Sequence, residues 1–407
     1  MLTYFPLPYP GEWWYSVLCR YHVCSGNSKH QSTIKELIPG RITAAIGSVY
    51  PNSTIRQILS GLPAGLLSVK DVIIKNTLFP YYSRFSSFEK KTAMLEQLCR
   101  GETIVITSIR KFTAKSVPKY CPQCVVEDRS AYGEAYWHID HQIPLMAICP
   151  EHGCSLQSAD DIIPTHIDYT FYPLESAYSE RSPPVSPSDI FPWQITFSRI
   201  LADYQRFPLT ASATPDYSNL AISLSNMSYG IIQNRSPNTI LDAKRLYWDM
   251  VETYGREFIE LIFGGEASIC TINRACKWEI ASPERYALLQ DFAGITSEEV
   301  FSTKPQRDRY EDKLLALQNT SGSYTKKQVQ EMLNITAAQL DILTKRYGIE
   351  PFWKEREGGR TKQIHLTLTA EEKQRIAKAA AIHGNGQTAV FAREVLLREV
   401  NRILKND

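Results

Sequence analysis

The first hundred residues repeat their apolar positions with the period of an α-helix. After Pro10-Gly11, apolar side chains recur at i, i+3, i+4 and i+7, on one stripe of a helix: Trp14, Val17, Leu18 and Tyr21. Several short helices separated by Gly, Pro and Asn are typical of a helix-turn-helix module, and also of a small helical bundle that reads no DNA groove. Another apolar stripe, at Ile55, Ile58, Leu59 and Leu62, predicts a second helix. Two capping-box pairs, Ser68 with Asp71 and Ser86 with Glu89, predict where two more helices begin.

The composition changes after residue 156. Residues 157–192 are rich in Ser, Pro, Asp and Tyr, with SERSPPVSPSD at their centre, and predict an extended connector. Helical patterns return over residues 193–207, in a long apolar stripe over 236–263, and over 283–294. These patterns predict a helical domain over residues 193–320.

The segment from residue 321 onward has the spacing of a helix-turn-helix. Tyr324-Thr325 caps a helix over Lys326–Leu333, residues 334–336 make a turn, and a second helix over Ala337–Tyr347 ends at Gly348. In such a unit the second helix reads bases in the major groove. We therefore predict DNA contacts from Lys326, Ala338, Gln339, Thr344, Lys345 and Arg346.

The residues that follow allow two DNA-binding interpretations. Phe352–Glu355 and Lys362–Leu368 can pair around a Gly-Gly turn as a β-ribbon, which resembles the wing of MerR-like winged helix-turn-helix regulators. Alternatively, QIHLTLT and the two helical segments after it match the strand-helix-helix of a ribbon-helix-helix protein, whose strands pair in a dimer. A third interpretation is a helical domain that makes protein contacts only. The ribbon residues predicted to reach phosphates or a minor groove are Arg356, Arg360 and Lys362.

Four residues between positions 121 and 152 have the spacing of a metal site. Cys121 and Cys124 form a CPxC pair, and Cys149 with His152 repeats that spacing after 24 intervening residues, again with Pro after the cysteine. Two such pairs that converge on one ion supply the Cys3His ligand set of a tetrahedral structural zinc site, with no position left for water. We predict that Zn²⁺ supplies folding free energy to a small zinc-finger region with little core of its own.

Three neighbouring residues allow a different chemistry. His138 and His141 could complete a second metal site or act as the base of a nuclease, and Cys154 could replace a ligand. The two histidines follow Tyr136-Trp137 and precede Pro144, a context that favours packing or backbone capping. We predict those roles for the histidines and a buried position for Cys154.

The charge is unevenly distributed along the 407 residues. Lys and Arg number 45 and Asp and Glu number 43, a formal charge of +2. Residues 1–120 hold fifteen basic and six acidic residues, a charge of +9, so the other 287 residues carry −7. This surplus predicts a basic N-terminal face for a polyanion or an acidic partner, or merely a solvated basic surface.

Length and cysteine usage place the chain in a broad class. A chain of 407 residues that is 43% hydrophobic is long enough for several globular domains. Nine cysteines, an odd number that includes a CxxC pair, indicate a reducing compartment rather than a disulfide scaffold. Neither a secretory signal nor an apolar run of about 18 residues occurs, so we expect a cytoplasmic protein without membrane spans.

The order of several motifs resembles one known family. FPLPYPGEWWYSVLCR, NTLFPYYSRF, YCPQC, YGEAYWHIDHQIP and CPEHG together resemble the TniQ/TnsD family of target-selection proteins from prokaryotic transposons, over residues 1 to about 156. The resemblance implies an N-terminal helix-turn-helix domain and a zinc finger whose ligands fall on Cys121, Cys124, Cys149 and His152. It also implies a protein that makes no covalent chemistry itself and that recruits an AAA+ ATPase regulator, which in turn engages the transposase.

The resemblance leaves open how the insertion site is found. Family members bind double-stranded DNA of an attachment site directly, or dock, commonly as a dimer, on a CRISPR RNA-guided Cascade-type complex; the C-terminal module favours direct DNA binding. A zinc-dependent transcription regulator and a metal-dependent nuclease are rival functions. The chain has no Gly-Lys dipeptide and hence no Walker A loop, so we predict that it is not the ATPase. It also has no GxSxG, HExxH or protein-kinase signature, so we predict that it is not an enzyme.

The predicted architecture is mainly α and multi-domain. It comprises an N-terminal helix-turn-helix domain (1–118), a treble-clef-like zinc-finger region (119–156), the connector (157–192), a helical domain (193–320), and a C-terminal winged helix-turn-helix or ribbon-helix-helix-like module (321–407).

Overall fold

The computed structural model is mainly helical, as predicted, and divides into two compact units. The first unit comprises residues 1–322 and 330–351, and the second comprises residues 323–329 and 352–407. The structure describes residues 2, 4–104, 117–159, 163, 167, 169–178, 190–209, 217–232, 239–265, 269, 272, 282–302, 306–320, 322–354, 366–383 and 387–405. None of the helices in these residues combines the length and the apolar character that crossing a membrane requires.

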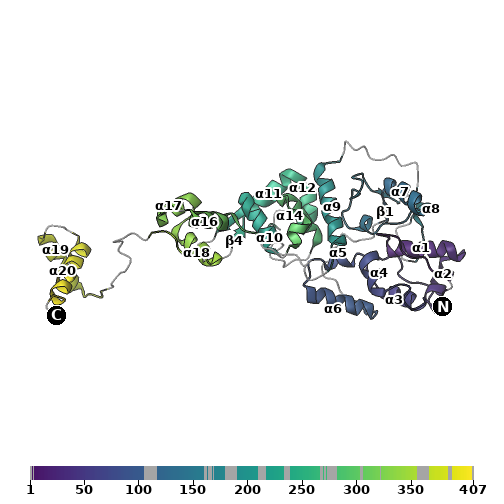
Figure 1. Ribbon diagram of the computed structural model, residues 1–407, viewed down its shortest axis with the longest axis horizontal. Helices are drawn as coiled ribbons and strands as arrows, with labels where there is room; N and C mark the ends of the chain where they lie inside the picture. The colour runs from purple at the N-terminus through teal and green to yellow at the C-terminus, as the bar shows by residue number, and fades with distance from the viewer. Residues whose placement is uncertain are drawn as a thin grey trace. The chain divides into compact units, whose positions relative to one another are not determined.

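The described residues up to position 104 of the first unit contain six helices (Figure 1): α1 (Trp14–Ser25), α2 (His30–Leu37), α3 (Ser53–Ser60), α4 (Val69–Asn76), α5 (Phe79–Ser83) and α6 (Phe88–Cys99). The apolar stripe predicted for α1 is buried along its whole length. Ser68 caps α4 as predicted, because its hydroxyl accepts the Asp71 N–H. The cap of α6 is Ser87 rather than the predicted Ser86, whose N–H closes the preceding turn on the Ser83 carbonyl.

The predicted zinc-finger region contains little regular structure. Its elements are β1 (Lys119–Tyr120), α7 (Pro122–Tyr132), the 3-10 helix η2 (Asp140–Gln142) and β2 (Gln157–Ser158). The two short strands pair antiparallel, with Lys119 opposite Ser158 and Tyr120 opposite Gln157. This pairing closes the region at both ends of its sequence.

The described part of the predicted connector differs from a linker. Ile163, Ile167 and Phe171 are buried in the same apolar cluster as α1, and a short helix, α8 (Leu174–Ala177), buries two further side chains there. The Trp137 indole N–H donates to the Tyr172 carbonyl at 2.8 Å. Aromatic and aliphatic residues within the Ser/Pro-rich composition therefore make this segment part of the N-terminal core.

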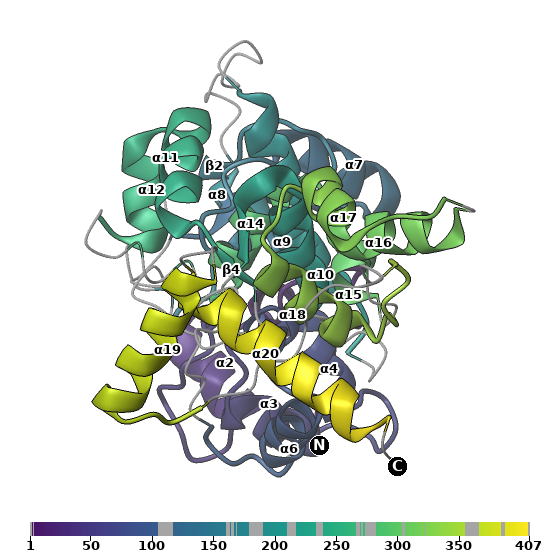
Figure 2. The same cartoon turned by 90° about the vertical axis from the view of Figure 1, so that its left-hand side faces the viewer.

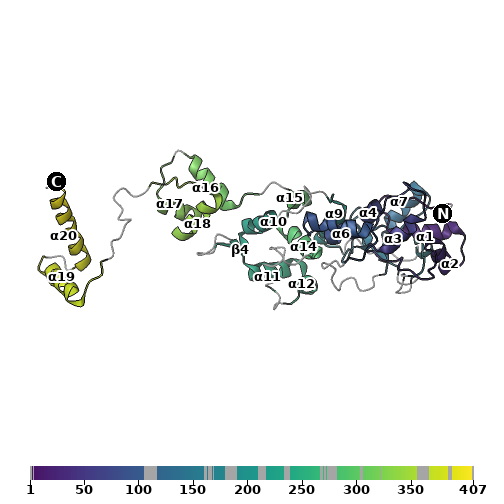
Figure 3. The ribbon, with the colours of Figure 1, turned by 90° about the horizontal axis from the view of Figure 1, so that it is seen from below.

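The helical domain predicted over 193–320 contains α9 (Pro192–Arg206), α10 (Tyr217–Leu224), the π-helical turn η5 (Ser225–Tyr229), a hairpin of β3 (Gly230–Ile232) and β4 (Thr239–Leu241), α11 (Ala243–Tyr254), α12 (Arg256–Phe263), α14 (Pro283–Ala293), α15 (Ser297–Phe301) and α16 (Arg309–Asn319). The apolar stripe over residues 236–263 predicts one continuous helix, and this prediction is wrong. Its start is a strand, and Gly255, at φ 86° and ψ 145°, separates α11 from α12. Figure 3 shows these helices from below.

The helices α5, α9 and α14 meet in the core of the first unit. The Arg84 side chain is fully buried there and donates hydrogen bonds to three carbonyls at the end of α9: Tyr204, Phe207 and Pro208. The Phe85 ring stacks on the Tyr286 ring of α14, with 4.0 Å between centroids. One guanidinium therefore satisfies a carbonyl in the last turn of α9 and two carbonyls directly after the helix.

The last four helices are α17 (Lys326–Leu333), α18 (Ala337–Tyr347), α19 (Ala370–Ile382) and α20 (Thr388–Ile403). The bounds of α17 and α18 are those predicted. Thr325 and Gln328 form a capping box, Asn334 takes φ 53° in the turn, and Gly348 ends α18 at φ 64°. Figure 2 shows α19 and α20 side by side.

We predict that Arg84→Lys lowers the free energy of unfolding by about 2–4 kcal/mol, because a lysine cannot reach the three carbonyls with one planar fork. Urea denaturation followed by circular dichroism measures the change. The control is Arg41→Lys on the exposed surface, for which we expect less than about 0.5 kcal/mol. Equal effects of the two variants would contradict this role of Arg84.

Candidate functional site

The start of α7 places two thiols of the predicted metal site. Cys121 is the N-cap residue of α7, directly after β1, and Cys124 lies in the first turn of the helix. Pro122 occupies the N1 position, where its fixed φ is suited to begin a helix. The CPxC sequence therefore sets both thiols at the same helix end.

A tight turn places the other two side chains. The Gly153 N–H donates to the Cys149 carbonyl, and the Cys149 N–H donates to the Cys154 carbonyl, both at 2.8 Å. Gly153 has φ 64°, a conformation that residues with a side chain rarely adopt. This turn points the Cys149 thiol and the His152 imidazole toward α7.

The four predicted ligands converge on one point. Their ligand atoms all lie within 4.8 Å of one another. The Cys124 Sγ lies 3.7 Å from the Cys149 Sγ, and the His152 Nδ1 lies 3.5, 3.3 and 3.5 Å from the sulfurs of Cys121, Cys124 and Cys149. Tetrahedral zinc, with Zn–S of about 2.3 Å and Zn–N of about 2.0 Å, has S···S and S···N edges of about 3.8 and 3.5 Å. The group therefore has the composition and spacing to hold a zinc ion.

Further contacts orient these ligands. The Glu127 carboxylate lies 2.9 Å from the His152 Nε2, which leaves Nδ1 to face the three sulfurs. The Cys154 Sγ lies 3.3 Å from the Cys121 Sγ. Hydrogen bonds among the three thiols lower the pKa of Cys121 to about 7 and raise the pKa of Cys124.

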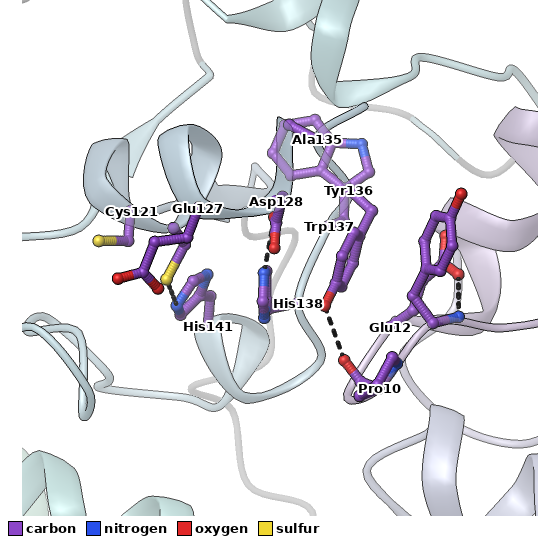
Figure 4. A network of polar contacts seen from close by, with 12 residues as sticks. Pro10, Glu12, Cys121, Glu127, Asp128, Ala135, Tyr136, Trp137, His138 and His141 are labelled. Carbon is purple, nitrogen blue, oxygen red and sulfur yellow. Dashed lines mark hydrogen bonds and ion pairs between the residues drawn. The ribbon is translucent and has the colours of Figure 1, made fainter. Parts of the chain in front are cut away.

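The buried His141 ring lies next to two of the ligand sulfurs. Its Nε2 lies 3.7 Å from the Cys149 Sγ and 3.9 Å from the Cys124 Sγ. Burial lowers the pKa of His141 to about 4, so its ring is neutral and carries one N–H. A proton on Nε2 lets this ring donate to the thiolates. The His141 side chain is labelled in Figure 4.

His138 belongs to a separate polar contact. Its Nε2 lies 2.9 Å from the Asp128 carboxylate on α7, and its ring stacks on Tyr136 at 4.4 Å between centroids (Figure 4). In the part of the chain that the structure describes, one group of side chains has the spacing of a metal site, and it contains neither His138 nor His141. Both histidines pack against neighbouring rings, which is one of the two roles predicted for them, and the hydrogen bonds described here go to side chains rather than to the backbone.

The N-terminal arm, residues 10–13, pairs with residues 136–139, which include His138. The Trp13 N–H donates to the Trp137 carbonyl and the Ile139 N–H donates to the Gly11 carbonyl, both at 2.8 Å. The Tyr136 hydroxyl donates to the Pro10 carbonyl at 2.9 Å (Figure 4). The arm therefore packs against the segment that lies between the two ligand pairs in the sequence.

A buried ion pair strengthens this junction. Arg20 of α1 contacts the Glu12 carboxylate at 3.0 Å and the Glu134 carboxylate, after α7, at 2.8 Å. Glu12 is fully buried, and burial raises its pKa to about 7 although Arg20 opposes the shift. Sequence reasoning missed the contact between Arg20 and Glu134, because these residues lie 114 positions apart in the chain.

The predicted DNA-binding residues of α18 occupy different environments. Ala338 and Lys345 are exposed, and with the exposed Asp341 they follow one face of the helix. Gln339 bonds back to the Thr336 N–H in a capping box. Thr344 is buried, and its hydroxyl donates to the Leu340 carbonyl at 3.0 Å. Asp341 was absent from the predicted set, although its spacing from Ala338 and Lys345 could have revealed it.

Two further predicted DNA contacts, Arg346 and Lys326, lie in defined environments. The Arg346 guanidinium lies 3.9 Å from Asp308, whose carboxylate also accepts the Tyr347 hydroxyl. The Lys326 Nζ lies 5.9 Å from the centre of the Trp353 ring, and the Lys354 N–H donates to the Tyr324 carbonyl. Arg356, Arg360 and Lys362, and with them most of the predicted ribbon, lie outside the described residues.

Comparisons with known proteins agree with the motifs in the first third of the chain. Residues 3–156 match the TniQ family model, a range that contains all four predicted metal ligands. The chain is also similar to the transposon Tn7 transposition protein TnsD of Escherichia coli, with 30% identity over 155 residues. That match covers 37% of this chain and 30% of the relative. The resemblance predicted from the motifs is confirmed for this region.

We predict that Cys149→Ser removes bound zinc and unfolds residues 119–156, because a hydroxyl is a poor replacement for a thiolate ligand and the region has little other structure. Elemental analysis of the purified chain measures the metal, and limited proteolysis followed by mass spectrometry measures the local unfolding. Cys154→Ser is the matched control, since Cys154 lies outside the four-ligand group; it should keep one zinc per chain. A metal-free wild-type chain that resists proteolysis would refute the site.

Proposed function

We propose that the chain is a member of the TniQ/TnsD family and that it selects the insertion site of a prokaryotic transposon, because its residues 3–156 match the family model. The observation that carries the proposal is the coincidence of the family match with the region around the four-ligand cluster. In this role the zinc is structural, because four protein ligands leave no position for substrate or water. The chain itself catalyses no covalent step.

Recruitment is the activity that we assign to the TniQ region. Two observations support a preformed docking surface there: the arm around Pro10 and Trp13 is held by backbone hydrogen bonds, and Glu12, Arg20 and Glu134 tie α1 to the end of α7. This surface combines segments that lie far apart in the sequence, so we expect it to keep its shape only while the four ligands stay together. The partner that we propose is an AAA+ ATPase regulator, which then engages the transposase.

Direct DNA reading is the second part of the proposal. The exposed face of α18 presents Ala338, Asp341 and Lys345, and the cap at Thr336 begins the helix as in a groove-reading helix. An alanine methyl can contact thymine, a carboxylate can accept from cytosine, and a lysine can meet guanine or a phosphate. Thr344, being buried, is left out of the proposed contacts, and Arg346 is oriented by Asp308.

We expect the wild-type chain to retain an AAA+ ATPase transposition regulator in a pull-down, and Cys149→Ser to lose it while Cys154→Ser keeps it. The physical reason is that loss of the cluster releases the segment that pairs with the N-terminal arm. Retention of DNA alone, with no ATPase, would favour a zinc-dependent transcription regulator instead. Co-purification with an RNA-guided complex, without DNA sequence preference, would favour the CRISPR adaptor.

For DNA binding we predict that Lys345→Ala weakens the affinity for the attachment-site duplex and lowers the slope of log K against log salt by about one, the loss of one phosphate contact. Gel shifts over a series of salt concentrations measure both quantities. Lys313→Ala, an exposed lysine of α16 in the same unit, is the control and should change neither. Identical behaviour of the two variants would remove α18 from the interface.

A further inference from the structure

A fifth sulfur lies beside the four-ligand cluster. The Cys154 Sγ is 3.3 Å from the Cys121 Sγ, a shorter distance than the 3.7 Å between the sulfurs of Cys124 and Cys149. Cys154 nevertheless lies outside the group of four side chains whose ligand atoms converge on one point. A tetrahedral zinc site takes four ligands and leaves no place for a fifth. The structure therefore places, next to one metal ligand, a thiol that the metal site does not use.

The backbone holds these two sulfurs close together. The Cys149 N–H donates to the Cys154 carbonyl at 2.8 Å, which closes the tight turn between them. After this turn the chain continues into β2, which pairs with β1 so that Gln157 lies opposite Tyr120. Cys121 directly follows Tyr120. Two sets of backbone hydrogen bonds therefore keep Cys154 near Cys121, although 33 positions separate them in the chain.

Solvent reaches these sulfurs unequally. The three ligand cysteines, Cys121, Cys124 and Cys149, are buried, whereas Cys154 is half-buried. A small oxidant in water therefore meets Cys154 before it meets a ligand sulfur. A zinc-bound thiolate also shares its electrons with the ion, while the sulfur of Cys154 keeps its lone pairs. An accessible thiol beside a second, resolving thiol is the usual arrangement of a redox-sensitive cysteine pair.

The exposed Cys24 of α1 lacks this arrangement. In the part of the chain that the structure describes, it has no other sulfur within hydrogen-bond distance. Oxidation at Cys24 can therefore go no further within the chain than a modified single thiol. This difference makes Cys24 a matched comparison for Cys154, since both sulfurs are open to solvent and only one has a thiol neighbour.

We propose that hydrogen peroxide, or another two-electron oxidant, joins Cys154 to Cys121 in a disulfide bond and thereby opens the metal site. Peroxide takes two electrons from the Cys154 thiol and leaves a sulfenic acid and one water. The Cys121 thiolate attacks that sulfur and forms the S–S bond, and the displaced hydroxide takes a proton from solvent to become a second water. Three of the four ligands then remain, too few for a closed tetrahedral site, and zinc is released.

The reaction is reversible, unlike the loss of a ligand by substitution. A dithiol reductant returns both sulfurs to thiols by exchange, after which all four ligands are again available to Zn²⁺. The metal content of the chain thus depends on the oxidant around it. The proposal rests on the four-ligand cluster and not on the proposed target-site function, so the two fail in separate experiments.

The experiment follows zinc and disulfide bonds in the full chain. The zinc-loaded protein is treated with a series of hydrogen peroxide concentrations. A chromogenic chelator measures the zinc released, and mass spectrometry of a digest made without reductant identifies the disulfide. For the wild type we expect one zinc released for each disulfide between Cys121 and Cys154. Dithiothreitol with added Zn²⁺ should restore the bound zinc.

Two serine variants test the role of Cys154. Cys154→Ser removes the oxidisable sulfur and keeps a hydroxyl that can donate to the Cys121 sulfur. We expect its rate of zinc release under peroxide to be lower than that of the wild type by about tenfold or more. Cys24→Ser is the control, and it should release zinc at the wild-type rate.

The disulfide map of the wild type decides the proposal even if Cys154→Ser fails to fold or the chain is isolated without zinc. A disulfide between Cys124 and Cys149 in place of the expected one would overturn the proposal. Equal rates of zinc release from the wild type and a folded Cys154→Ser would also overturn it. In that case Cys154 would only donate an S–H hydrogen bond to the metal ligand beside it.

Discussion

The closure of three thiols and one imidazole around a single point is the constraint on which the N-terminal part of this protein depends. Between Cys124 and Cys149 the chain has little regular structure, yet its residues 136–139 are held edge to edge against residues 10–13. Such backbone pairing between remote segments costs conformational entropy that two short strands and one helix repay only in part. A metal ion of the size and preference that the cluster fits would make up the difference.

Several of the basic side chains counted in residues 1–120 are buried or paired and are not exposed to a polyanion. Arg84 and Lys91 are buried, Arg20 lies between two carboxylates, and the Lys119 ammonium donates to backbone carbonyls inside the zinc-finger region. Burial lowers the pKa of Lys91 and of Lys119 to about 8. Arg20, Arg84 and Lys119 therefore bond within the fold and Lys91 is buried, so the basic surface available to a polyanion is smaller than a count of residues indicates.

Local chemistry was predictable from the sequence, and long-range pairing was not. The bounds of α17 and α18 and the four-ligand group follow from caps, a turn and fixed spacings, all of which act within a few residues. The break at Gly255 was missed because an apolar stripe continues across it. The roles of Glu127, Asp128 and His141 were missed because each depends on a partner brought near by the fold.

The packing of Phe171 and its neighbours has a practical consequence for anyone who isolates the N-terminal region. The family match ends at residue 156, but Ile163, Phe171 and Leu174 fill the same core as α1, and the Tyr15 hydroxyl donates to the Thr170 carbonyl. A fragment trimmed to the match would expose the apolar floor on which the arm and α1 rest. The smallest piece that retains this floor extends at least to Tyr178, which packs edge-on against Tyr120.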